Sequence, residues 1–246
     1  MPPTRIPAID VARGIAMVAM MVFHLGWDLV FFGLPSVPSD SVLFWLVFPR
    51  AIVSTFLLIA GMSFILAHGT VWRGRLFWRR LGVLGAAAGL ITTVTWFIYR
   101  DGLIFFGVLH AMAAFSVLAI ALRHAPAPAL LGLAGLVLLV GINVRAAAFQ
   151  HPSLIWLGLS PIPPASFDFV PPFPFLAPFL CGMAIGRLGL SGGWFTMAWS
   201  RWPAADPTSR LLRWVGRWSL PIYLLHQPIL LIAVFALAAI TWILQN

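Results

Sequence analysis

Histidine, aspartate and arginine occur within apolar stretches of this sequence, where they could carry out proton-transfer or group-transfer chemistry. His24 and Asp28 are four residues apart, so on a helix their side chains share one face. A carboxylate beside an imidazole orients the ring and fixes its tautomer. This arrangement is typical of a general base or of a nucleophilic imidazole. The same spacing also fits a buried polar pair in which Asp28 neutralises Arg50.

The composition places these residues in a membrane protein. The chain has 246 residues, of which 61% are hydrophobic and 9% charged, whereas a soluble domain is about half apolar and about a quarter charged. All 15 basic residues are arginine and all 6 acids are aspartate. The absence of lysine excludes a retinal Schiff base, and the absence of glutamate leaves aspartate as the only carboxylate base. Cys181 is the only cysteine, so an internal disulfide and a cysteine metal cluster are excluded, and we expect no metal site.

Seven apolar stretches approach the length of about 20 residues that a membrane-spanning helix needs. They lie at about 12–33, 41–68, 80–99, 102–122, 128–144, 172–190 and 219–243. The sequence therefore predicts an all-α polytopic membrane protein with seven transmembrane helices, in which residues 1–246 form a single domain. Gly85 with Gly89, and Gly182 with Gly186, are spaced for close helix packing.

The arginines predict the orientation. If the N-terminus lies inside, the inner segments hold 12 arginines and the outer loops hold only Arg100 and Arg145, a bias that indicates an N-in, C-out topology. The inner arginines are Arg5, Arg13, Arg73, Arg75, Arg79, Arg80, Arg123, Arg187, Arg201, Arg210, Arg213 and Arg217. The net charge of +9 then reflects topology and attraction to the anionic lipid bilayer, and it is no argument for nucleic-acid binding.

Two predicted loops are longer than simple connections. The outer loop, about 145–171, contains several prolines that prevent a regular helix, and we expect it to form a lid. The inner loop, about 191–218, contains Asp206-Pro207-Thr208, which predicts the cap and first turn of a short interfacial helix. On that helix Arg210, Arg213 and Arg217 share one face, opposite Leu211, Leu212 and Val215.

Four polar residues fall near the middle of the predicted membrane. At about 1.5 Å per residue, His24 lies roughly 13 Å below the outer boundary, Arg50 and His110 come to similar depths, and His226 lies about 11 Å above the inner boundary. A charge at such depth costs about 3 kcal/mol or more, so we expect these residues to surround one polar cavity. Taken alone, His110 fits a structural histidine bonded to a backbone carbonyl.

Other polar residues have simpler expected roles. Pro228 frees backbone carbonyls that His226 or Gln227 can contact. Asp10 and Arg13 fit a helix-start charge and its partner three residues on. The remaining histidines are expected to be solvated at helix ends or in loops, and these are His68, His124 and His151.

Six segments carry a family resemblance. They are residues 5–14 (RIPAIDVARG), 23–28 (FHLGWD), 54–61 (STFLLIAG), 106–110 (FGVLH), 168–174 (DFVPPFP) and 219–228 (SLPIYLLHQP). Together they resemble the heparan-α-glucosaminide N-acetyltransferase catalytic-domain family of transmembrane acyltransferases, in its short bacterial form. More distantly, the first and last segments are similar to membrane O-acyltransferases that modify surface polysaccharides.

The resemblance implies acyl transfer across the membrane, from acyl-CoA (acetyl-CoA) on the cytosolic side to an amine or hydroxyl of a glycan or other cell-envelope acceptor. His24 matches the essential first-helix histidine of the family and would act as the base or accept the acyl group, with Asp28 orienting it. The thioester oxyanion would be stabilised by His110, Arg50 or His226. Asp168 would shape the acceptor site, and Gln227, Asp10 and Arg13 complete the expected substrate-binding residues.

The donor phosphates would bind inner arginines, and two groups are candidates. They are Arg73, Arg75, Arg79 and Arg80, and Arg210, Arg213 and Arg217. The expected location is the inner cell membrane. The sequence leaves the oligomeric state open, a homodimer included.

Two other classes of protein use the same residue types. A small-molecule or proton transporter also places histidine, aspartate and arginine within the membrane. A b-type cytochrome uses pairs of histidines as haem ligands.

Overall fold

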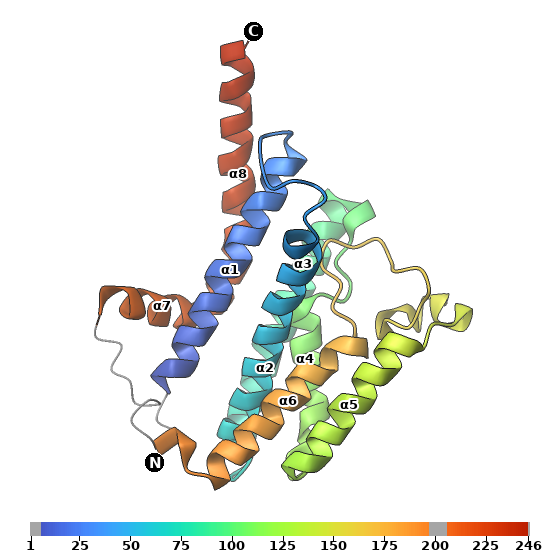
Figure 1. Cartoon of the computed structure of the whole chain (residues 1–246), viewed down its shortest axis with the longest axis vertical. Helices are drawn as coiled ribbons and strands as arrows, with labels where there is room; N and C mark the ends of the chain where they lie inside the picture. The colour runs from blue at the N-terminus through green and yellow to red at the C-terminus, as the bar shows by residue number, and fades with distance from the viewer. Residues whose placement is uncertain (1–5, 197–205, 246) are drawn as a thin grey trace. The chain divides into compact units, whose positions relative to one another are not determined.

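The computed structural model describes residues 6–196 and 206–245, which fold into helices joined by turns (Figure 1). The α-helices are α1 (Pro7–Phe31), α2 (Phe48–His68), α3 (Gly74–Ile98), α4 (Val108–Leu122), α5 (Ala127–Asn143), α6 (Pro172–Ser191), α7 (Pro207–Arg217) and α8 (Ser219–Gln245). A π-helical turn leads into α2, and single 3-10 turns lie at Arg100–Gly102, Ala147–Gln150, Ile155–Leu157 and Trp194–Thr196. Arg5 and Arg201 lie outside the described residues.

Among the described residues, five helical segments are long and apolar enough to cross a bilayer. They are Pro7–Phe31, Leu43–His68, Gly74–Ile98, Pro172–Ser191 and Ser219–Leu244. Helices α4 and α5 are also apolar but have only 15 and 17 residues, fewer than the roughly 20 that span the hydrocarbon core. The chain is therefore an all-helical, multi-pass membrane protein, while the seven-span count and the N-in orientation stay predictions.

Helix α4 begins later than the predicted 102–122 stretch, and the outer loop is the reason. The backbone N–H of Val170 donates to the carbonyl of Phe106 at 2.9 Å, and that of Phe167 donates to Gly102 at 3.1 Å. Phe106 and Phe169 thereby form an isolated bridge. The segment before Val108 is extended because it pairs with the end of the outer loop, which contains 3-10 turns but no α-helix, as predicted.

The described chain divides into two compact units, and the boundary lies within α2. Leu57–Phe195 form one unit. Of the described residues, 6–56, 196 and 206–245 form the other.

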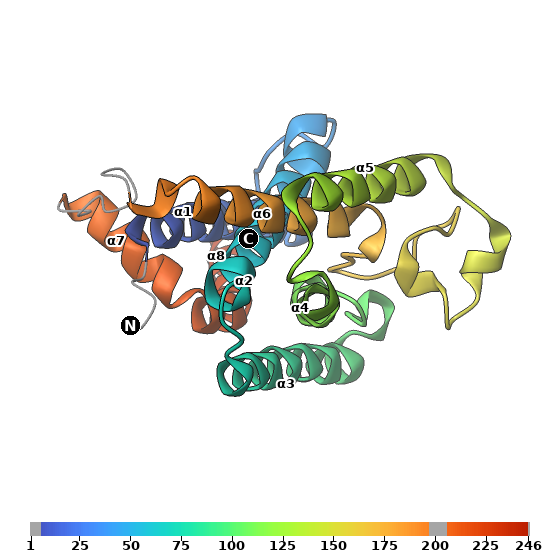
Figure 2. The same cartoon turned by 90° about the horizontal axis from the view of Figure 1, so that it is seen from below.

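Within Leu57–Phe195, α5 lies beside α6 and α3 lies beside α4 (Figure 2). Helices α2 and α6 touch backbone to backbone, because a side chain at Gly61 would collide with the Phe179 carbonyl and one at Gly182 with the Leu58 carbonyl. The predicted close packing is confirmed for Gly182. It is wrong for Gly85 and Gly89, where a side chain would find nothing within 4 Å.

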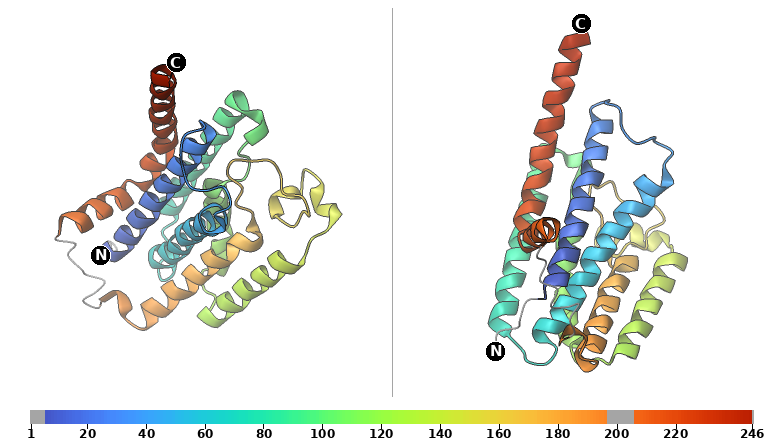
Figure 3. Two further views of the ribbon diagram at one scale, coloured as in Figure 1. Left: turned by 45° about the horizontal axis from the view of Figure 1, so that its top comes forward. Right: turned by 60° about the vertical axis from the view of Figure 1, so that its left-hand side comes forward.

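In the other unit, α1 and α8 run side by side and α7 crosses α1 (Figure 3). The crossing is close because Gly14 lies against the backbone of Leu212 and Gly216 lies against the backbone of Asp10. The core of this unit consists of Ala16, Met17, Met20, Ile52, Phe56 and Val215.

Helix α7 begins as the sequence predicted. Asp206 is its N-cap and accepts a hydrogen bond from the Ser209 backbone N–H at 2.8 Å, and Pro207 occupies the first turn. This bond holds the pKa of the Asp206 carboxyl below its usual range, with a further contribution from the Ser209 hydroxyl. Val215 is buried as expected, but Leu211 is 60% exposed, so the predicted apolar face is only partly covered by α1.

Candidate active site

Two histidines from opposite ends of the sequence meet in the unit that contains α1 and α8. His24 lies on α1 and His226 on α8, and their ring centroids are 5.0 Å apart with an interplanar angle of 57°. Neither ring nitrogen of His24 has a hydrogen-bond partner among the described residues. The two rings are therefore close enough for one bound group to contact both.

The tautomer of His226 follows from its hydrogen bond. Its Nδ1 lies 2.6 Å from the backbone carbonyl of Tyr223, one turn earlier on α8. A carbonyl only accepts, so Nδ1 carries the proton and Nε2 presents a lone pair. Nε2 is buried and has no partner among the described residues. His226 is thus an oriented imidazole whose basic nitrogen is available, an arrangement typical of a general base.

Asp28 forms its hydrogen bond with Gln227 rather than with His24. The Gln227 side-chain amide donates to Asp28 Oδ1 at 2.7 Å, and the Asp28 side chain is fully buried. Asp28 Oδ2 and Gln227 Oε1 are also buried and have no partner in the described part of the chain. Asp28 Oδ2, Gln227 Oε1 and His226 Nε2 are thus three buried hydrogen-bond acceptors to which no group among the described residues donates.

The expected pairing of Asp28 with His24 or Arg50 is therefore wrong for the described residues. The contact between α1 and α8 brings Gln227 to Asp28. Arg50 stays on its own helical segment, where Nη1 donates to the Leu46 carbonyl at 3.1 Å and the side chain is exposed.

His110 and Asp168 lie in the other unit, where they hold the start of α4. His110 Nε2 lies 3.1 Å from Thr92 Oγ1. Because that hydroxyl donates to the Ile104 carbonyl at 2.6 Å, Nε2 is the donor to Thr92. His110 Nδ1 then accepts from the backbone N–H of Gly107 at 3.3 Å. Both ring nitrogens are thus engaged, as expected for a structural histidine.

Asp168 has a comparable local contact. Its Oδ2 accepts from the Val108 backbone N–H at 2.8 Å, so the carboxylate lies at the positive end of α4. Any part that Asp168 plays in acceptor binding would come in addition to this contact.

The remaining predicted site residues lie on α1, on α7, and on or just before α3. Asp10 and Arg13 form the expected pair, 3.1 Å apart. Arg75, Arg79 and Arg80 are exposed on α3 beyond the half-buried Arg73. On α7, Arg210 and Arg217 are exposed, and Arg213 is half-buried with its Nε lacking a partner among the described residues.

The sequence prediction was wrong for one histidine and missed one contact. His68 was expected to be solvated, but it is only 4% exposed, whereas His124 and His151 are exposed as expected. The Tyr223 carbonyl, which orients His226, was not identified. The signal was present, because Tyr223 precedes His226 by three residues, close to Pro228.

Unpaired polar groups buried between apolar helices are typical of multi-pass membrane proteins that transfer protons or chemical groups. Residues 5–228 match the family model described as heparan-alpha-glucosaminide N-acetyltransferase, catalytic. The chain belongs to this family of membrane acetyltransferases, and the match includes His24, Asp28, His226 and Gln227. No curated protein and no solved structure matches the chain.

Proposed function

We propose that this protein transfers an acetyl group from acetyl-CoA to an amine of a glycan or other cell-envelope acceptor, and that His24 and His226 carry out the transfer. The single observation that supports this most strongly is the pair of rings 5.0 Å apart, one of which is held by a backbone carbonyl. Membership of the acetyltransferase family supplies the reaction class.

The two histidines differ in a way that suggests separate roles. His226 is oriented by Tyr223 and presents a basic Nε2, whereas His24 has no orienting hydrogen bond among the described residues. A nucleophile beside an oriented base is the general pattern of covalent catalysis. In our proposal His24 attacks the thioester carbonyl, the C–S bond breaks, and the CoA thiolate leaves. The proton that the His24 ring loses passes to His226 Nε2.

The second half of the reaction regenerates the pair. The acceptor amine attacks the acetyl-imidazole, a C–N bond forms, and His24 leaves as the free ring. The proton that the amine loses goes to the histidine pair, and the proton held from the first step is released to the CoA thiolate or to solvent. Arg50 and His110, whose hydrogen bonds lie elsewhere, are not part of this proposal.

The unpaired atoms favour an amine over a hydroxyl as the acceptor. Asp28 Oδ2, Gln227 Oε1 and His226 Nε2 can all accept a hydrogen bond. An amine brings two or three N–H donors and a hydroxyl brings only one. A fully buried carboxylate without a cation among the described residues also favours a ligand that can carry positive charge.

The donor would approach from the arginine-rich side of the membrane, which the charge bias assigns to the cytosol. Arginine binds phosphate through paired N–H donors, so Arg73 and Arg80, in and just before the first turns of α3, are the proposed contacts of the CoA phosphates. The acceptor would then lie toward the opposite side, consistent with an enzyme of the inner cell membrane.

The test is to incubate the purified full-length protein with acetyl-CoA carrying a labelled acetyl group, first without an acceptor and then with glucosamine. We expect CoA release, retention of label on His24 before the acceptor is added, and its loss afterward. His24→Ala should abolish both, and His151→Ala, an exposed histidine, is the matched control. Turnover without labelled protein would replace the covalent route by direct transfer. Proton or solute flux in liposomes with no CoA release would instead identify a transporter.

A further inference from the structure

His68 is a buried histidine that is not part of the proposed catalytic pair. His68 ends α2, is only 4% exposed, and its Nδ1 has no hydrogen-bond partner among the described residues. The rings of Phe64, Trp72 and Phe77 surround it at centroid distances of 5.3, 5.2 and 5.8 Å. His68 also lines a small cavity, together with Arg80 of α3 and Ser116 of α4.

Arginines from three helices gather around this imidazole. Arg123 directly follows α4. Its guanidinium group lies 5.3 Å from the centre of the Trp72 ring. Arg187 of α6 donates to the Arg123 backbone carbonyl, and its Nε is buried without a partner in the described part of the chain. Arg73 and Arg80 lie within electrostatic reach of His68. The ends of α2, α3, α4 and α6 therefore bring these groups together.

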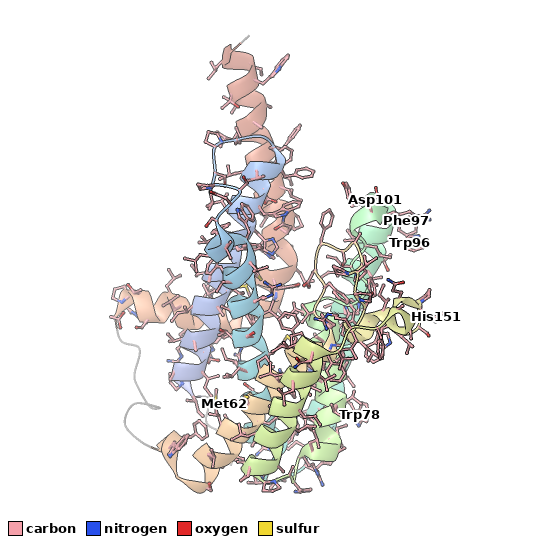
Figure 4. All side chains as sticks on the ribbon, turned by 45° about the vertical axis from the view of Figure 1, so that its right-hand side comes forward. Met62, Trp78, Trp96, Phe97, Asp101 and His151 are labelled. Carbon is pink, nitrogen blue, oxygen red and sulfur yellow. The ribbon has the colours of Figure 1, made fainter. Side chains whose placement is uncertain are left out.

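The two carboxylates of this unit lie away from the cluster. Within Leu57–Phe195, all of which is described, the only acids are Asp101 and Asp168. Asp101 follows the far end of α3, where it lies with Trp96 and Phe97 at the opposite end from Trp78 (Figure 4). The 25 residues of α3 correspond to about 37 Å at 1.5 Å per residue. Asp168 caps α4 at Val108, whereas Arg123 follows the other end of that helix.

We infer that His68, Arg80, Arg123 and Arg187 form a binding site for a phosphate-ester anion. Several like charges beside a buried, unpartnered imidazole are stabilised when an anion lies between them, and guanidinium groups bind phosphate in a charge-assisted geometry. The same chemistry could come from the phosphates of CoA or from an anionic lipid headgroup. The first source rests on the proposed function and would place the nucleotide end of the donor at the ends of α2, α3, α4 and α6. The second source does not rest on it.

Helix α3 supplies matched controls. Arg80 follows the buried Phe77 by three residues and precedes the buried Leu84 by four, so it shares their face. Arg75 and Arg79 are four residues apart and exposed, and they do not line the cavity. The proposal therefore predicts that Arg80 contributes to anion binding and that Arg75 and Arg79, on the same helix, do not.

The probe is adenosine 3′,5′-bisphosphate, the phosphate-bearing end of CoA without its acyl arm, titrated into the full-length protein in detergent by calorimetry. Arg80→Gln and Arg123→Gln should each weaken its binding about tenfold, the loss of one charge-assisted contact. Arg75→Gln and Arg79→Gln should bind like the parent. Arg80→Lys keeps the charge and should retain part of the affinity, and the melting temperature of every variant reports folding.

A parallel series in nanodiscs with and without phosphatidylglycerol identifies the source of the phosphate. If the bisphosphate does not bind but the anionic lipid raises the melting temperature of the parent and not of Arg80→Gln, the site holds a lipid headgroup. Equal responses of Arg80→Gln and Arg79→Gln to both probes overturn the inference. Bisphosphate binding without acetyl transfer would contradict only the proposed function, and turnover with affinity unchanged in all variants would contradict only this site.

Discussion

The imidazole of His226 lies 5.0 Å from that of His24, centroid to centroid, while its Nδ1 is held by the Tyr223 carbonyl at 2.6 Å. The first relationship depends on packing between α1 and α8, and the second is local to one turn of α8. Together they give one ring an orienting partner and leave the other without one, which is why we assign the two histidines different roles.

Replacing the oriented histidine should slow acetyl transfer without preventing folding. His226→Gln removes the basic Nε2, and the loss of a general base lowers kcat by about 100-fold or more. Acetyl-CoA consumption by the purified variant measures the effect, with His151→Ala as the exposed control. A rate equal to that of the parent would show that His226 takes no proton in the reaction.

Asp28 and Gln227 should be coupled in stability. Gln227→Leu leaves the buried carboxylate without its donor and should cost about 1–3 kcal/mol, whereas Asp28→Leu combined with Gln227→Leu should recover much of this loss. The comparison is made by unfolding in mixed micelles. Asn143→Leu removes an exposed amide that bonds only within its own helix, and it should change stability by less than about 0.5 kcal/mol. Additive effects of Asp28→Leu and Gln227→Leu would contradict the coupling.

His110 should behave differently from the proposed catalytic pair, His24 and His226. His110→Phe removes the contacts with Thr92 and Gly107 that hold the start of α4, so the melting temperature should fall. The rate per folded molecule should change less than about tenfold, because neither ring nitrogen is available to substrate. Activity normalised to the folded fraction separates these effects. A large loss of activity in fully folded His110→Phe would restore His110 to the site.

The sequence predicted the helices better than the contacts between them. Long apolar runs and their flanking prolines located α6 and α8 to within two residues, because burial in lipid demands such runs. Helix α1 begins five residues earlier than predicted. The start of α4 was missed because a pairing between Phe106 and Val170, distant in sequence, overrides the local apolar pattern. The predicted depth in the membrane singled out His24 and His226, whose rings do lie close together, but it gave no information on which residue of another helix Asp28 would contact.

His68 is a second case in which the sequence did not predict a contact between elements. Its position at a helix end predicted a solvated ring, yet Phe64, Trp72 and Phe77 bury it. Spacing in the sequence shows which side chains share a helix face. It does not show that Trp72 and Phe77 cover the ring of His68, because this depends on how the chain turns back after α2.

The crossing of α1 and α7 should be sensitive to a single methyl group. A side chain at Gly216 would collide with the Asp10 backbone carbonyl, so Gly216→Ala should destabilise the protein by about 1–3 kcal/mol through overpacking. Gly85→Ala, where nothing lies within 4 Å, should be neutral or stabilise by up to about 1 kcal/mol, since alanine favours a helix. Melting temperatures in one detergent compare the two. Equal shifts would mean that α7 does not rest on α1 at Gly216.

The cap of α7 should give the protein a pH-dependent element at acid pH. The Ser209 N–H holds the pKa of Asp206 below its usual range, so the folded state favours the carboxylate. The resulting stabilisation is fully present above the ordinary pKa of aspartate and is lost as the pH falls through the lower, folded value. Asp206→Asn keeps a capping side chain but cannot titrate, so its melting temperature should depend less on pH between about 3 and 5 than that of the parent. Asp206→Ala should lose the cap at every pH. If parent and Asp206→Asn show the same acid dependence, other groups set the acid sensitivity and the carboxylate of Asp206 contributes nothing to it.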